Sequence, residues 1–147
     1  MLEPTLAPTP CTCFRMRKLT RLMTQRYDRA LAAAGLNINQ YSLLRRAGIE
    51  PRAIGELAQE MGMDRSTLSR DLKPLAAAGW VDIATGDDAR RRVVKVTAAG
   101  WRAVAKAKPL WREAQDEIEG LIGSAGTQRL HTQLDFALRR LQSGGAR

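Results

Sequence analysis

The middle of the chain carries the pattern that most restricts how it can fold. Residues 53–61 and 65–75 have the apolar spacing of two short helices, and Gly62 stands in the tight turn between them. Residues 80–84 and 93–96 then alternate between apolar and polar side chains, as strands with one buried face do. This order predicts a helix-turn-helix that continues directly into a β-hairpin.

Two helices are predicted before this motif. Apolar residues recur at threes and fours over residues 13–34, and Gly35 ends that helix. Asn37 is followed three residues later by Gln40, which is the signature of a capping box at the start of a second helix. The first half of the chain is therefore predicted to be mainly helical.

Two further helices are predicted after the hairpin. Thr97 caps a long helix, which Pro109 is expected to interrupt because proline lacks the N–H that an interior turn needs. Glycines in residues 123–126 are expected to separate it from a last helix with an apolar stripe, formed by Leu130, Leu134, Leu138 and Leu141. The 147 residues are thus expected to form one domain that is mainly α with a small β-hairpin.

The second helix of the motif has an apolar side and a polar, cationic side. Asp64 is predicted to cap its start, and Pro74 is expected to bend it or to remove a hydrogen bond near Arg70. Hydroxyl and cationic side chains bind DNA phosphates and base edges, and a helix fits the major groove. The alternative is the ordinary solvated face of an amphipathic helix. The polar side consists of Arg65, Ser66, Thr67, Ser69, Arg70 and Lys73.

The expected tip of the hairpin is strongly basic. Arg90, Arg91 and Arg92 repel one another and contribute nothing to folding, which indicates a polyanionic partner. Asp88 lies two positions before Arg90 and is expected to hold its guanidinium in place. The composition agrees, since 19 of the 24 basic residues are arginine and the formal net charge is +9. Ribosomal, nucleoid and membrane-surface proteins are also basic, so the location of the charge carries more weight than its sum.

The sequence lacks the features of membrane proteins and of enzymes. No apolar run is long enough to span a bilayer, and residues 1–12 are predicted to be a flexible tail rather than a signal peptide, so we expect a cytoplasmic protein. His131 is the only histidine, and there is no Gly-rich phosphate loop, nucleophile elbow or metal-ligand cluster. The sequence predicts no catalytic site, no metal and no cofactor.

The most specific stretches of the chain are AIGELAQEMGMDRSTLSRDLKPLAAAGWVDI and, shortly after it, DDARRRVVKVTAAG. In combination they resemble the MarR family of bacterial regulators, and the resemblance extends over about residues 13–141. The family pattern of Asp-x-Arg in the hairpin and Thr-x-x-Gly after it is met by Asp88, Arg90, Thr97 and Gly100. One departure is Ala53, where family members usually have a Ser or Thr cap.

The resemblance implies a winged helix-turn-helix with N- and C-terminal dimerisation helices. The implied division is a tail over residues 1–12, dimerisation helices over 13–36 and 98–142, and a DNA-binding domain over 37–97. In this family the second motif helix reads the major groove, the wing arginine enters the minor groove, and a homodimer binds a pseudo-palindromic operator. The implied function is a sequence-specific transcriptional regulator, usually a repressor, that a small-molecule or oxidant signal releases. The alternatives are a non-specific basic protein of the nucleoid type and, with less support, a small enzyme.

The resemblance also suggests where a small molecule would bind. Family members commonly hold small phenolic or aromatic acids between the dimerisation helices and the DNA-binding part. Tyr27, Trp101 and Trp111 are candidates for lining such a pocket, although aromatic residues at helical spacing belong more often to a core.

Cys13 is the candidate for sensing an oxidant. With Phe14 and Tyr27 it resembles the branch of the family that senses organic hydroperoxides. A helix start, with Arg17 one turn later, favours the thiolate, which is the form that peroxides attack. That branch has a tyrosine where Arg17 stands, and Cys11 is so near that a disulfide with Cys13 would be strained. The alternatives are an inert buried thiol, or a Cys-x-Cys pair that binds soft metals.

Overall fold

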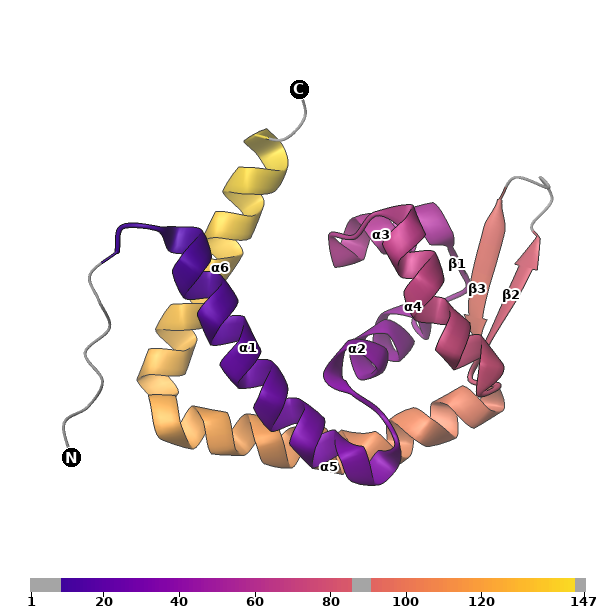
Figure 1. Ribbon diagram of the computed structural model, residues 1–147, viewed down its shortest axis with the longest axis horizontal. Coiled ribbons are helices and arrows are strands. Elements are labelled where there is room, and N and C mark those ends of the chain that lie inside the picture. Colours follow the sequence, from indigo (N-terminus) through magenta and orange to yellow (C-terminus); the bar gives the residue numbers. More distant parts are fainter. Residues whose placement is uncertain (1–8, 86–90, 145–147) are drawn as a thin grey trace.

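The structure is a computed structural model that describes residues 9–85 and 91–144. It is mainly helical with one small antiparallel sheet, as the sequence predicted (Figure 1). In chain order the elements are α1 (Thr12–Leu31), the 3-10 helix η1 (Ala32–Ala34), α2 (Ile38–Ala47), β1 (Arg52–Ala53), α3 (Ile54–Met61), α4 (Arg65–Ala77), β2 (Val81–Thr85), β3 (Arg92–Val96), α5 (Ala98–Ile122) and α6 (Ser124–Gly144). None of the helices in the described ranges is long and apolar enough to cross a membrane.

Two of the predicted helix starts are capped as the sequence indicated. The side chain of Asn37 accepts the N–H of Gln40 at 2.8 Å, and the N–H of Asn37 donates to the side chain of Gln40 at 3.0 Å. The Thr97 hydroxyl accepts the N–H of Gly100 at 3.0 Å and donates to the carbonyl of Gly79 at 2.6 Å. These caps fix where α2 and α5 begin.

The two helices of the helix-turn-helix start without side-chain caps. Ala53 occupies the N-cap position of α3 and has no group that caps it, as expected. Asp64 occupies the N-cap position of α4, but among the described residues its side chain makes no capping hydrogen bond, so that prediction is wrong. Gly62 ends α3 in the left-handed region, with φ of 67°, which a residue with a side chain rarely adopts.

Proline interrupts neither of the helices that contain it. Helix α5 is continuous over 25 residues through Pro109, so the predicted interruption is wrong. Ala107 and Ala114 are buried on either side, and this packing keeps the helix together despite the lost hydrogen bond. Helix α4 likewise runs through Pro74. The break after α5 is also shorter than predicted, because only Gly123 separates it from α6.

The sheet has the order β1-β3-β2, with both pairs antiparallel. Strands β2 and β3 form the predicted hairpin and pair Val81 with Val96 and Ile83 with Val94. Strand β1 was missed by the sequence analysis, because two residues are too few to show an alternating pattern. It places Arg52 opposite Val94 and so joins the start of α3 to the hairpin.

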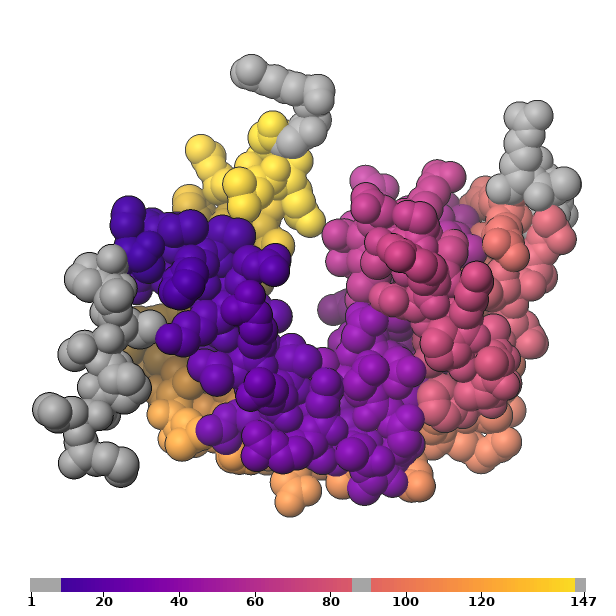
Figure 2. Space-filling model, viewed as in Figure 1, coloured from indigo at the N-terminus to yellow at the C-terminus, as the bar shows by residue number. Residues whose placement is uncertain are grey.

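The core lies mainly in the arm that contains the helix-turn-helix. Figure 1 shows α5 along the base, with α6 and the start of α1 rising at one end and α3, α4 and the hairpin at the other. An open hollow separates these two arms in the space-filling view (Figure 2). The fully buried large side chains are Leu31, Leu43, Leu44, Leu57, Leu68, Leu72, Leu75, Val81 and Val94.

Candidate nucleic-acid interface

One side of helix α4 packs into the core, and the opposite side faces solvent. Leu68, Leu72 and Leu75 are fully buried and hold the helix against the core. The opposite side is the polar one that the sequence predicted. Arg65, Ser66, Arg70 and Lys73 are exposed there, and Thr67 and Ser69 are half-buried. A helix seated in this way keeps its orientation while its polar side remains open to a partner.

Contacts with other residues restrain several side chains of this surface. Arg70 donates to the hydroxyl of Thr67 at 3.4 Å, one turn earlier in the same helix. Asp71 accepts a hydrogen bond from the Asn39 side chain at 3.0 Å, which ties α4 to the start of α2. Neither partner of this second bond can be identified from the sequence, since they lie 32 residues apart.

Arg65 lies directly on the first turn of α3. Its guanidinium occupies the space where Gly55 has no side chain, because a Cβ added there would lie 2.6 Å from Nη2 of Arg65. Glycine is therefore required for this approach. Gly55 was missed by the sequence analysis, since the close approach arises only when α3 and α4 pack together.

The structure describes only part of the predicted basic wing. Arg91 and Arg92 are exposed at the loop end of the hairpin, where β3 begins, whereas Asp88 and Arg90 lie outside the described residues. Arg91 donates to the carboxylate of Glu56 on α3 at 3.0 Å. The prediction that these arginines gain nothing from folding is therefore wrong for Arg91, although an exposed ion pair contributes only about 0–1 kcal/mol.

One cavity joins the polar side of α4 to the wing. It has a volume of about 410 Å³ and is lined by Arg65 and Ser69 from α4, Arg91 and Arg92 from the hairpin, and the first turn of α3. The structure thus brings together residues that the sequence assigned separately to the helix and to the wing. Three arginines and the single carboxylate of Glu56 give this cavity a net positive charge, which suits a phosphate group.

The two thiols lie at the start of α1 and are free and exposed. Cys11 is the N-cap residue, and its sulfur accepts the N–H of Phe14 at 3.4 Å. Cys13 follows as the second residue of the helix, one position further in than the sequence indicated. The helix thus begins at Thr12, inside the predicted tail, and Cys13 is not the buried inert thiol of the alternative interpretation.

The structure does not bring Cys13 and Tyr27 together within one chain. They lie in the same helix 14 positions apart, which corresponds to about 21 Å at 1.5 Å per residue. The Tyr27 hydroxyl instead donates to the side chain of Gln115 on α5, which in turn donates to Glu119 at 3.0 Å. Partial burial and, secondly, the carboxylate of Glu119 raise the pKa of Tyr27 above its ordinary value.

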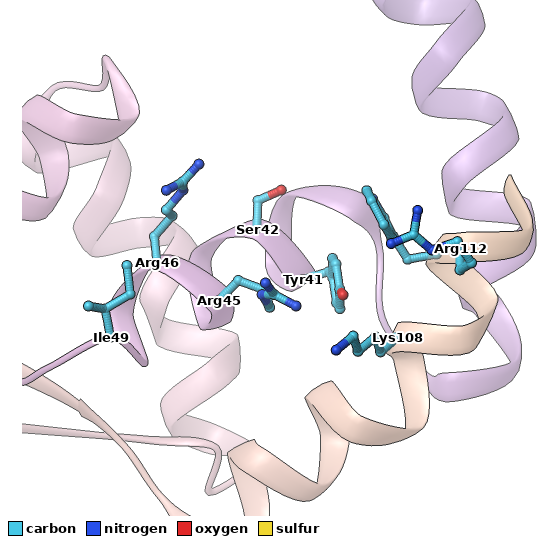
Figure 3. Close-up of a pocket in the computed structure, with 8 residues that line it drawn as sticks. Tyr41, Ser42, Arg45, Arg46, Ile49, Lys108 and Arg112 are labelled. Carbon is cyan, nitrogen blue, oxygen red and sulfur yellow. The ribbon is translucent and has the colours of Figure 1, made fainter. Parts of the chain in front are cut away.

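A second cavity, which we call the α2–α5 cavity, has a volume of about 450 Å³ (Figure 3). Its lining includes Tyr41 and Arg45 from α2 and Lys108 and Trp111 from α5. Of the three aromatic residues proposed for a ligand pocket, only Trp111 lines it. Trp101 packs against Gly48 instead, and Tyr27 is bonded to Gln115 as described above.

The described residues include no group of three or more His, Cys, Asp or Glu side chains placed to hold a metal ion. His131 is exposed on α6.

Comparisons with known proteins show which family has this architecture. A family model described as MarR family matches residues 34–92. Two solved structures of the M. tuberculosis transcriptional regulator MosR are similar over most of the chain. The one in complex with DNA is 35% identical, covers 88% of this chain and 97% of that chain, and has a TM-score of 0.78. The other is 32% identical, covers 91% of this chain and 99% of that chain, and has a TM-score of 0.75.

More distant structures share the fold. A mutant of MarR from E. coli, complexed with operator DNA, is 20% identical, covers 86% of this chain and 92% of that chain, and has a TM-score of 0.76. A search among curated protein sequences found no match. The chain is 35% identical to a transcriptional regulator that it matches over 97% of that protein's length, and the family model covers the helix-turn-helix and the first strand of the hairpin. The chain therefore belongs to the MarR family of winged helix-turn-helix transcriptional regulators and is not an enzyme.

Proposed function

We propose that this protein is a sequence-specific DNA-binding repressor that acts as a homodimer. The observation that carries the proposal is the cavity where Arg65 and Ser69 of α4 meet Arg91 and Arg92 of the hairpin. Side chains from both parts of a winged helix-turn-helix there form one cationic surface. The structures of MosR and of the MarR mutant were both solved with DNA, which supports the same partner for this chain.

The proposed docking follows from the dimensions of B-DNA. Helix α4 enters the major groove, where Ser66, Arg70 and Lys73 reach base edges and phosphates. The hairpin reaches the neighbouring minor groove, where Arg90 inserts and Asp88 holds its guanidinium. Residues 37–97 act as the DNA-binding domain in this proposal.

The homodimer is proposed from apolar side chains that one chain leaves exposed. Leu138 and Leu141 of the predicted stripe are 55% and 75% exposed, whereas Leu130 and Leu134 are half-buried. A second copy that covers this surface would remove a large apolar area from water. Residues 13–36 and 98–142 are the proposed dimerisation helices. Further exposed apolar residues on the same elements are Phe14, Met16, Leu22, Leu121, Ile122 and Phe136.

Release from DNA is proposed to follow a change in the geometry of the dimer. A ligand or an oxidant that favours one arrangement of the dimerisation helices would alter the spacing of the two α4 helices. Two features support such a signal. The α2–α5 cavity lies between a helix of the DNA-binding domain and a dimerisation helix, and two exposed thiols lie at the start of α1.

The direct test is a comparison of selected with random DNA. Sequences that the protein retains from a random pool are expected to bind at least about 10³-fold more tightly than unselected DNA at physiological salt. Equal affinity for both would instead show a non-specific nucleoid-type protein, for which the net charge of +9 would be sufficient.

A further inference from the structure

Glu56 brings a negative charge into the candidate DNA-binding surface. Among the described residues that line the cavity between α4 and the hairpin, it is the only acidic one, beside Arg65, Arg91 and Arg92. A carboxylate at this place repels a DNA phosphate that approaches the arginines. A cationic surface for DNA does not by itself explain why Glu56 stands there.

The stability of the fold gives only a weak reason for Glu56. It lies in the first turn of α3, which has no side-chain cap, and a negative charge there favours the helix start. Its ion pair with Arg91 is exposed at both ends, and exposed ion pairs stabilise a fold little. Neither reason requires an acidic side chain that reaches the hairpin.

The bond to Glu56 restrains Arg91 where the pairing of the hairpin strands has ended. The last pair of the β2–β3 ladder joins Thr85 and Arg92, so Arg91 lies one residue beyond the paired part of β3. There Nη2 of Arg91 donates to Oε1 of Glu56 at 3.0 Å. The bond spans 35 residues of the chain and connects the loop end of the hairpin to the first turn of α3.

The same turn of α3 also contacts an arginine of α4. Arg65 lies against Gly55, the residue before Glu56. Two consecutive residues of α3 therefore place one arginine of α4 and one arginine of the hairpin, and both arginines line the same cavity. Phosphate contacts fix the register and orientation of a protein on DNA, so the relative position of these two cations affects how the protein docks.

An arginine that is bonded to a carboxylate can still bind a phosphate. The guanidinium has five N–H donors in a rigid planar fork, which can bind partners at two edges. Glu56 accepts from Nη2 of Arg91, and a second edge of the fork suits phosphate oxygens. A side chain whose direction is already set loses less conformational freedom when it binds. Glu56 thus opposes DNA through its charge and favours one phosphate contact through its bond.

We propose that Glu56 is a specificity-determining residue, which orients Arg91 toward a phosphate of the selected DNA and repels DNA that does not fit. This inference rests on the proposed function. Non-specific binding depends mainly on total charge, so the carboxylate weakens it. Specific binding depends also on the direction of each phosphate contact, so the bond to Arg91 strengthens it. Glu56 therefore raises the ratio of the affinity for selected DNA to the affinity for random DNA.

Two variants of Glu56 separate its bond from its charge. Glu56→Ala removes both, so affinity for random DNA is expected to rise about twofold and affinity for selected DNA to fall about fivefold. Glu56→Gln removes the charge but keeps an oxygen that accepts from Arg91, so both affinities should rise about twofold and their ratio should stay the same. Fluorescence anisotropy measures both affinities. An unchanged ratio in Glu56→Ala, or an equal loss of ratio in the two variants, would overturn the proposal.

Glu50→Ala is the matched control for the loss of charge. Glu50 is exposed, belongs to the proposed DNA-binding domain and lies outside the lining of the cavity. Its loss should raise both affinities alike and leave their ratio unchanged. If Glu50→Ala lowers the ratio as much as Glu56→Ala does, the ratio depends on charge alone and the proposal is wrong. Thermal unfolding adds a second control, because a role in starting α3 alone would lower the melting temperatures of Glu56→Ala and Glu56→Gln without separating their ratios.

A double-mutant cycle tests whether Glu56 acts through Arg91. In Arg91→Ala, the further change Glu56→Ala is expected to alter the ratio less than about twofold, because no guanidinium remains to be oriented. A further loss of about tenfold would show that Glu56 acts through another group. Equal binding of selected and random DNA by the wild type would refute the proposed function and this inference with it. A wild-type preference for selected DNA that Glu56→Ala leaves intact would refute this inference alone.

Discussion

Single residues set the geometry of the candidate DNA-binding surface, and Gly55 is the clearest example. Because it has no side chain, it leaves the space in which Arg65 lies on the first turn of α3. Because the group it meets is the flexible end of an arginine, Gly55→Ala is expected to displace Arg65 without unfolding the protein. Alanine is also the better helix former, so the thermal stability of α3 should not fall.

For Gly55→Ala we therefore expect an unchanged or higher melting temperature and an affinity for selected DNA that is about 1–2 kcal/mol weaker. Fluorescence anisotropy measures this affinity. Arg65→Ala is the control, because Gly55→Ala should have no further effect in a protein that lacks the arginine. Additive effects of the two changes would show that Gly55 acts in another way.

Arg90 and Lys73 are predicted to contribute to DNA binding differently. Arg90→Ala should weaken binding of selected DNA by about 1–3 kcal/mol if the side chain enters the minor groove. Lys73→Ala should mainly reduce the dependence of affinity on salt, since a phosphate contact releases counterions. Titrations at several salt concentrations distinguish the two. Unchanged affinity in both variants would rule out the proposed docking.

Variants of the two cysteines test which thiol responds to an oxidant. Cys13→Ser is expected to bind DNA normally and to ignore organic hydroperoxide, because the thiolate that peroxide converts to a sulfenic acid is gone. Cys11→Ser is expected to bind normally and still to respond. Gel-shift titrations of both variants, with and without hydroperoxide, make the comparison. Wild-type protein that stays on DNA through complete oxidation would show that the signal is not an oxidant.

At the scale of the helices and strands, the features that could be predicted from the sequence join residues close together in the chain. The capping box of Asn37 and Gln40 and the cap at Thr97 join residues three positions apart, so their pattern is visible in the sequence. The effect of Pro109 was misjudged because packing around it outweighs its local cost. The pair of Arg91 and Glu56 spans 35 residues, and only the folded chain shows it.

The contact between α1 and α5 is predicted to depend on Tyr27. Tyr27→Phe removes its hydrogen bond to Gln115 and should lower the free energy of unfolding by about 1 kcal/mol at neutral pH. Because folding raises the pKa of this tyrosine, its stabilising effect is complete below the ordinary value of 10.0 and is lost as pH rises through the folded value. Urea unfolding from about pH 7 to 11 measures this dependence. If the free energy of unfolding of Tyr27→Phe falls equally steeply at high pH, groups other than Tyr27 cause the loss.

At the scale of the whole molecule, exposed apolar side chains of α6 predict a partner. Leu138→Glu should convert a dimer at micromolar concentration into monomers, since it places a charge on the surface that the second copy covers. Gln128→Glu is the matched control, because it adds the same charge at an exposed polar position of the same helix that lies off the leucine stripe. Sedimentation velocity distinguishes the species. A wild-type monomer that still binds its selected DNA would contradict the proposed dimer.

Hydroxyl-radical footprinting on selected DNA tests the central claim most directly, because it reports where both subunits meet the two strands. We predict two protected regions related by two-fold symmetry, with centres about one helical turn, or 10 base pairs, apart. Minor-groove protection outside each region should be lost in Arg90→Ala, while the central regions remain. A single protected region, or uniform protection without symmetry, would contradict a winged-helix dimer that reads two half-sites.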